Sequence, residues 1–139
     1  MSDYDQEVEK IRSINQPILE EFQSWLKKSG LSTKTVKNHH ENIDFFAEYL
    51  VYYEPLYRLD EGDAGDVQAF LLDWYPRKAM WASPTYTRSY MASFRKFFKF
   101  LAETNRIEQT TVDEVRGTLK ENKEDFLDAV AFDDTDYDW

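Results

Sequence analysis

The sequence predicts an all-α protein built as a single bundle of four to five helices. Three observations support this fold class. Only four glycines and four prolines interrupt the 139 residues, long segments place apolar residues at helical spacing, and no segment shows the alternation typical of a strand. With 17% aromatic residues and no cysteine, the chain can fill a core without disulfide bonds.

The first helix is expected to begin near Pro17, because proline is favoured in the first helical turn. Its apolar side chains recur at helical spacing from Ile18 to Leu26, and Gly30 is expected to end it. The acidic residues 1–13 are expected to form a flexible N-terminus.

Ser32 is expected to cap a second helix that runs to about Tyr52. Its predicted core stripe has His39 and His40 at the edges. The core residues of this stripe are Val36, Ile43, Phe46, Ala47 and Leu50. The opposite side begins with Lys34, Lys37 and Asn38 and continues as an aromatic stripe of Phe45, Tyr49 and Tyr52.

Residues 54–63 are expected to form a loop, and Asp63 or Asp66 then caps a short helix that Pro76 ends. Ser83 and Pro84 begin a fourth helix as cap and first-turn residue. One arc of this helix is apolar, with Thr87, Tyr90, Met91, Phe94, Phe97, Phe98 and Leu101. The opposite arc carries Thr85, Arg88, Ala92, Arg95, Lys96 and Lys99.

The C-terminal part is expected to contain one more helix and an acidic tail. Thr111 is the predicted cap, with Glu114 completing a capping box. The domain organisation is therefore a flexible segment 1–13, a helical domain 14–108, a C-terminal helix 109–130 and an acidic tail 131–139.

Charge is distributed in blocks along the chain. The formal net charge is -10, yet residues 27–40 carry four lysines and no acid, and residues 77–106 carry seven bases and one acid. Two basic segments in an acidic protein indicate local surfaces for an anionic partner.

Two motifs carry a resemblance to a known family. Leu31, Ser32 and Thr35 match a Leu-Ser-x-x-Thr helix cap, and Ser-Pro precedes a long helix that ends in an aromatic run. The second motif is matched by Ser83, Pro84, Phe94, Arg95, Phe97, Phe98, Phe100 and Leu101. In this order, over residues 14–108, the chain resembles the N-terminal core-binding (SAM-like) domain of tyrosine recombinases and phage integrases. Tyr86, Thr87 and Arg88 depart from the family pattern.

The resemblance implies a helical domain that forms half of a clamp around duplex DNA, with its second and fourth helices facing the DNA. The basic arcs described above lie on these same two helices. The expected DNA-binding residues are Lys34, Thr35, Lys37, Asn38, Thr85, Arg88, Arg95, Lys96 and Lys99. Arg and Lys suit phosphate contacts, and Asn38 or Arg88 has the donors to read a base edge.

No catalytic activity, metal or cofactor is expected. The family's catalytic residues are an Arg, a His-x-x-Arg pair and a nucleophilic Tyr, and neither His39 nor His40 is followed by such an Arg. Tyr137 stands among four aspartates that would repel a phosphate. The acids of residues 60–66 lack the spacing of a calcium loop.

Two alternatives remain open. The chain could instead be a helical protein–protein adaptor or an oligomerisation module, with the stripe of Phe45, Tyr49 and Tyr52 as its interface; contact with other recombinase protomers is a related possibility. The acidic tail could keep the protein soluble or compete with DNA for the cations. No apolar run is long enough for a membrane span, and a cytoplasmic location is expected.

Overall fold

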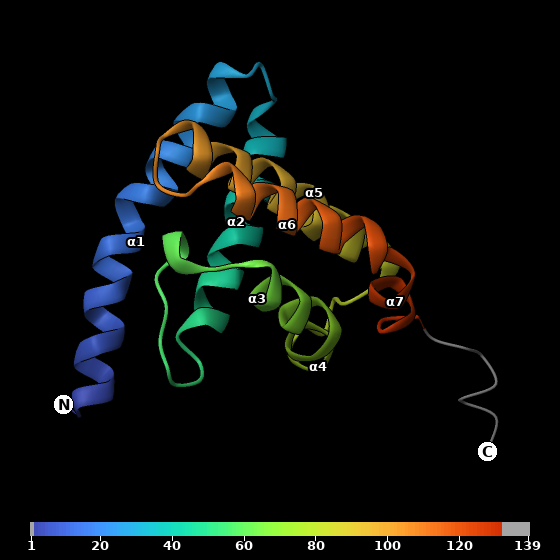
Figure 1. Cartoon of the computed structure of the whole chain (residues 1–139), viewed down its shortest axis with the longest axis horizontal. Coiled ribbons are helices and arrows are strands. Elements are labelled where there is room, and N and C mark those ends of the chain that lie inside the picture. The colour runs from blue at the N-terminus through green and yellow to red at the C-terminus, as the bar shows by residue number, and fades with distance from the viewer. Residues whose placement is uncertain (1, 132–139) are drawn as a thin grey trace.

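The structure is a computed structural model that describes residues 2–131 (Figure 1). The described residues contain helices and no strand, which confirms the predicted all-α class. All of the predicted acidic tail except Ala131 lies outside the described residues.

The helices pack around one core. In chain order the elements are α1 (Asp3–Lys28), α2 (Thr33–Leu50), η1 (Leu59–Glu61), α3 (Ala64–Ala69), η2 (Phe70–Trp74), α4 (Tyr75–Lys78), α5 (Pro84–Glu103), α6 (Gln109–Glu121) and α7 (Lys123–Asp128). α1 runs along one side of the molecule and α2 packs against both α1 and α5 (Figure 1). α6 and α7 lie against α5, so the segment 109–130 belongs to the same bundle.

The first helix begins at Asp3, so the prediction of a flexible segment 1–13 and a start near Pro17 was wrong. Ser2 caps the helix by accepting a hydrogen bond from the Asp5 backbone N–H at 3.2 Å. The apolar side chains Val8 and Ile11 are buried against Val51. This tertiary contact stabilises a polar segment that has little helical signal of its own.

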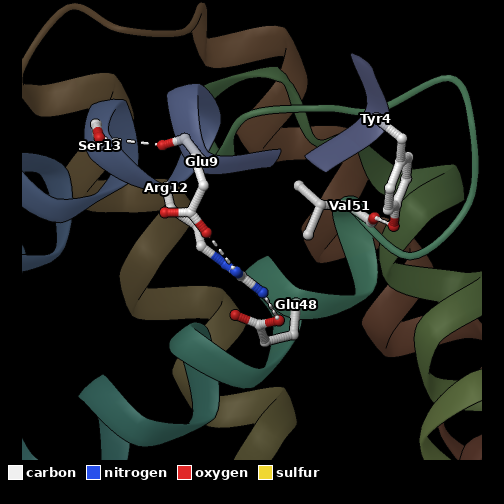
Figure 2. A network of polar contacts seen from close by, with 6 residues as sticks. All are labelled: Tyr4, Glu9, Arg12, Ser13, Glu48 and Val51. Carbon is white, nitrogen blue, oxygen red and sulfur yellow. Dashed lines mark hydrogen bonds and ion pairs between the residues drawn. The ribbon is translucent and has the colours of Figure 1, made fainter. Parts of the chain in front are cut away.

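Polar contacts also hold the start of α1 to the end of α2 (Figure 2). The Tyr4 hydroxyl donates to the Val51 carbonyl at 2.5 Å, and the Arg12 guanidinium bonds Glu48 at 2.9 Å and Glu9 at 3.0 Å. Pro17 lies exposed inside the helix, where it lacks the N–H of one backbone bond. The contacts with α2 offset this loss.

The predicted caps and core stripes of α2 and α5 are confirmed. Ser32 accepts from the Thr35 N–H and Ser83 from the Tyr86 N–H, each at 3.2 Å. Gly30 has φ +87°, a conformation that glycine adopts without steric cost. Every residue predicted for the apolar side of either helix is buried.

Pro76 does not end the third predicted helix, because helical structure continues from Ala64 to Lys78. The turn before the proline is widened, and the Tyr75 N–H bonds the Phe70 carbonyl five residues back. Pro76 follows in the first turn of α4, where a missing N–H is tolerated.

The C-terminal segment also differs from the prediction. Glu108 precedes α6 in place of Thr111, and Asn122 interrupts the predicted single helix. Five of the six apolar positions expected to face the core are nevertheless buried: Val112, Val115, Leu119, Phe126 and Val130. The sixth, Leu127, is half-buried.

The aromatic stripe expected to point outward from α2 mostly packs inside. Phe45 and Tyr49 are half-buried against the core, and only Tyr52 is largely exposed. Phe70 is fully buried at the centre of this packing, with ring centroids 5.5–6.0 Å from seven other rings. These belong to Phe45, Phe46, Tyr49, Trp74, Tyr75, Tyr90 and Phe94.

We expect Phe70→Ala to lower the free energy of unfolding by about 3–5 kcal/mol, because it removes a fully buried ring and leaves a cavity. Chemical denaturation followed by circular dichroism measures this loss. Leu72→Ala is the matched control, since Leu72 lies on the same helical segment and is 37% exposed. Its effect should stay below about 1 kcal/mol; equal losses in the two variants would contradict this picture of the core.

Candidate nucleic-acid interface

A set of lysines and arginines on α2 and α5 forms the candidate interface. We define the basic face as Lys34, Lys37, Arg88, Arg95, Lys96 and Lys99. All are exposed except Lys96, which is half-buried. α2 and α5 are in direct contact, so the two predicted basic arcs belong to neighbouring helices.

A buried polar seam fixes how these two helices meet. His39 Nδ1 lies 2.7 Å from the Ser93 hydroxyl oxygen, and the Asn42 amide donates to Ser93 and to Ser89, each at 3.0 Å. His39 and Asn42 are each 8% exposed and Ser93 is fully buried. Since a buried polar group without a partner is costly, these bonds favour one register.

The seam is satisfied without rearrangement when His39 is neutral. The Ser93 oxygen accepts a hydrogen bond from the Asn42 amide, and the Ser93 hydroxyl can donate its own proton in a hydrogen bond to an unprotonated Nδ1. Burial, and then the positive charge of Lys96, lower the pKa of His39. His39 therefore adds no charge to the basic face at neutral pH.

The seam also shows that α2 and α5 run antiparallel. Asn42 bonds to Ser89 and Ser93. His39, which comes earlier on α2, bonds to Ser93 and lies near enough to Lys96, which comes later on α5, for the lysine charge to lower its pKa. The start of α2 therefore lies beside the last turns of α5. This arrangement places one group of predicted residues at the same end of the helix pair: Lys34, Thr35, Lys37, Asn38, Arg95, Lys96 and Lys99.

Thr85 and Arg88 lie toward the other end of the pair. Eleven residues separate Arg88 from Lys99, which corresponds to about 16 Å along a helix. The capped N-termini at Ser32 and Ser83 are likewise at opposite ends. The structure thus separates the predicted site residues into a main group and a distal pair.

The cations of the basic face are hardly neutralised by carboxylates of residues 2–131. Only Lys37 has an ion pair in this range, with Glu41 at 3.9 Å, and these side chains are 73% and 60% exposed. Such an exposed pair contributes little. Glu103, at the end of α5, instead accepts a hydrogen bond from the Trp25 indole N–H at 2.8 Å.

The other bases of residues 77–106 behave differently. Arg77 pairs with Asp73 at 3.0 Å, Arg106 pairs with Glu21, and the Lys78 ammonium donates to the Tyr52 hydroxyl at 2.8 Å. These three are engaged within the chain. The bases of this segment with neither an ion pair nor a side-chain hydrogen bond among the described residues are those on the face of α5.

Sequence reasoning missed Asn42, Ser89 and Ser93. A signal for them exists, because Asn42 follows His39 by three residues and Ser93 follows Ser89 by four, which puts each pair on one side of its helix. The sequence does not say that the two pairs meet.

The described residues hold no group of three or more acidic or histidine side chains placed to bind a metal ion. Within the same range, no helix is both long and apolar enough to cross a bilayer.

We expect His39 to make folding sensitive to acid. Its pKa is lower in the folded protein than the ordinary 6.5, so the unfolded chain binds more protons and stability falls as pH drops through that value. His39→Asn keeps a polar group at this position but cannot be protonated. Between pH 7.5 and 5.5 the variant should therefore lose less unfolding free energy than the wild type.

Chemical denaturation at the two pH values gives this comparison. His40→Asn is the control, because His40 is adjacent, half-buried and has no hydrogen bond to α5 among residues 2–131. It should follow the wild type. A wild-type pH dependence retained in His39→Asn would show that His39 is not the responsible group.

No protein-family model, curated protein or solved structure matches this chain. The resemblance to tyrosine recombinases and integrases therefore rests on the helix-cap and aromatic motifs of the sequence. The basic face is an observation about this molecule and does not depend on that resemblance.

Proposed function

We propose that this chain is a non-catalytic DNA-binding module that contacts duplex DNA through the basic face of α2 and α5. One observation carries the proposal: five of the six cations of this face have no ion pair among the described residues, in a protein with a net charge of -10. In a chain with many carboxylates, a cluster of cations that has almost no carboxylate partners is suited to bind an anionic molecule.

The residues around these cations suit a phosphate backbone. Thr35 and Thr85 lie in the first turns of α2 and α5, where hydroxyl and backbone N–H groups can donate to phosphate. Asn38 is exposed one turn after Lys34 and has the donor and acceptor to read adenine. Arg88, at the distal end, would contact a separate stretch of the duplex.

The overall acidity does not prevent this contact. Salt screens charge beyond about 8 Å at physiological ionic strength, so a phosphate at the basic face responds mainly to the nearest cations. The binding is then electrostatic, moderate in strength and sensitive to salt.

The module would not cleave DNA by itself. His39 is buried and bonded to Ser93, which leaves it unavailable to a scissile phosphate. By its resemblance to the integrase core-binding domain, the chain would position DNA for a catalytic domain or act as an accessory protein in integration or recombination. A cytoplasmic location fits this role and the absence of cysteine.

We expect Lys34→Ala/Lys96→Ala/Lys99→Ala to abolish most DNA binding, because it removes three cations of the main group. Fluorescence anisotropy with a labelled 20-base-pair duplex measures the affinity at 50 and 200 mM salt. If the wild type neutralises about four phosphates, its affinity should fall on the order of 100-fold over this range. The triple variant should bind more weakly at low salt and depend less on salt.

Lys10→Ala/Lys120→Ala/Lys123→Ala is the matched control, since it removes three exposed lysines from α1, α6 and α7. It should bind DNA almost as the wild type does. If both triple variants lose the same affinity, only total charge matters. If the wild type does not bind duplex at 50 mM salt, the proposal fails.

An adaptor would use other residues for its interface than the stripe of Phe45, Tyr49 and Tyr52 that the sequence suggested. Phe45 and Tyr49 are half-buried and pack against the core. In the α4–α5 connection, by contrast, Met80 is 100% exposed and Trp81 is 45% exposed. Exposed apolar side chains close together are typical of protein contacts. Light scattering on the DNA-free protein would reveal self-association through this region.

A further inference from the structure

The end of the α2–α5 pair opposite the main basic group contains a groove. It is lined by α2, by the start of α5 and by Trp81 of the connection before α5. Its volume is about 520 Å³, within the range of small-molecule sites. None of the cations of the basic face lines it.

One wall of the groove is aromatic. The ring centroids of Phe45 and Trp81 are 5.3 Å apart, and those of Phe45 and Tyr90 are 6.4 Å apart. The Trp81 indole N–H donates to the Tyr90 hydroxyl at 3.4 Å, which orients the indole. Trp81 and Tyr86 are 45% and 50% exposed, so their rings are open to a ligand.

The other wall is acidic. Glu41, Asp44 and Glu48 follow at helical spacing on α2 and all line the groove. Glu48 is paired with Arg12 at 2.9 Å and Glu41 lies 3.9 Å from Lys37. Asp44 has no direct ion pair with any of residues 2–131, although the charges of His40 and Arg12 are near enough to act on it.

Asn42 gives an independent observation in the lining of the groove. The residue is 8% exposed, and its amide nitrogen donates to Ser89 and Ser93. Its side-chain carbonyl oxygen accepts no hydrogen bond from the described residues and is accessible to solvent. Asn42 lines the groove, so an acceptor is available there to an N–H or polarised C–H group.

We propose that this groove is a binding site for an organic cation, an ammonium or guanidinium group carried by a small molecule or a basic side chain. Aromatic faces attract such cations, most strongly when the site is partly desolvated. The free carboxylate of Asp44 supplies the counter-charge and Asn42 an acceptor. An anion would meet three carboxylates and is disfavoured.

The environment of Asp44 agrees with this assignment. Burial raises the pKa of Asp44, Glu48 adds to the effect, and the charges of His40 and Arg12 oppose it. Asp44 is an exposed residue whose carboxylate is partly shielded from water by its neighbours. A cation held between Asp44 and Trp81 would favour the charged carboxylate and stabilise the folded state.

Two-dimensional NMR of the ¹⁵N-labelled full chain provides the test, with the Trp81 indole signal assigned by its loss in Trp81→Leu. Choline serves as the free cationic probe. The peptide Gly-Arg-Gly, acetylated at its N-terminus so that arginine carries its only positive charge, serves as the side-chain probe. 3,3-Dimethylbutan-1-ol, which has the shape of choline without its charge, is the neutral control. We expect saturable shifts of the Trp81 signal with at least one cation and none with the alcohol.

The variants locate the site. Asp44→Asn should weaken the affinity about tenfold, and Trp81→Leu should remove the shifts of neighbouring amides. Glu124→Gln, the same loss of charge on α7, should change nothing. Lys34→Ala/Lys96→Ala/Lys99→Ala should also bind the cation normally, which separates this proposal from DNA binding.

Each outcome decides the proposal. Binding of choline alone identifies a free quaternary ammonium as the ligand type, and binding of the peptide alone identifies a basic side chain. Equal shifts with the alcohol would show an apolar groove instead of a cation site. No saturable shift with either cation, or an unchanged affinity in Asp44→Asn, would also overturn the assignment.

Discussion

The antiparallel packing of α2 against α5 is the constraint on which the surface of this protein depends. Most of the interface is aromatic, with pairs such as Phe46 and Phe94 packed edge to face at 4.9 Å between ring centroids. The bonds from His39 and Asn42 to Ser93 add a directional constraint, because a shift by one turn would leave buried polar atoms without partners. The aromatic rings therefore supply the burial, and the polar seam selects the register.

This register decides which charges become neighbours. The lysines at the start of α2 come to lie beside those in the last turns of α5, and the acidic stripe that begins at Glu41 comes to lie beside Trp81 and Tyr86. A parallel arrangement would place Lys34 near Arg88 and the acidic stripe near Lys96 and Lys99, and would mix the two kinds of charge. The separation of the main basic group from the acidic, aromatic end is thus a property of the packing and not of the composition. Of the basic face, Arg88 lies toward the acidic end.

Local chemistry explains which parts of this structure the sequence could predict. The caps at Ser32 and Ser83 and the buried sides of α2 and α5 depend on residues close in sequence, and all were predicted. The helix from Asp3 was missed because it depends on contacts with Val51 and Glu48. The basic residues were recognised by their spacing. The seam and the groove were not, since each combines residues that are more than thirty-five positions apart.

The two ends can act independently because the helices are long relative to the range of charge. Fourteen residues separate Lys34 from Glu48 on α2, which corresponds to about 21 Å. This distance is more than twice the Debye length of about 8 Å at physiological salt. The far part of the acidic stripe therefore does not cancel the field felt by a phosphate at Lys34, whereas Glu41, 3.9 Å from Lys37, weakens it locally. The acidic end also disfavours an approach of DNA from that side. Repulsion between the acidic parts of the protein and an anionic partner then orients the two molecules as they meet, and the basic end makes the contact.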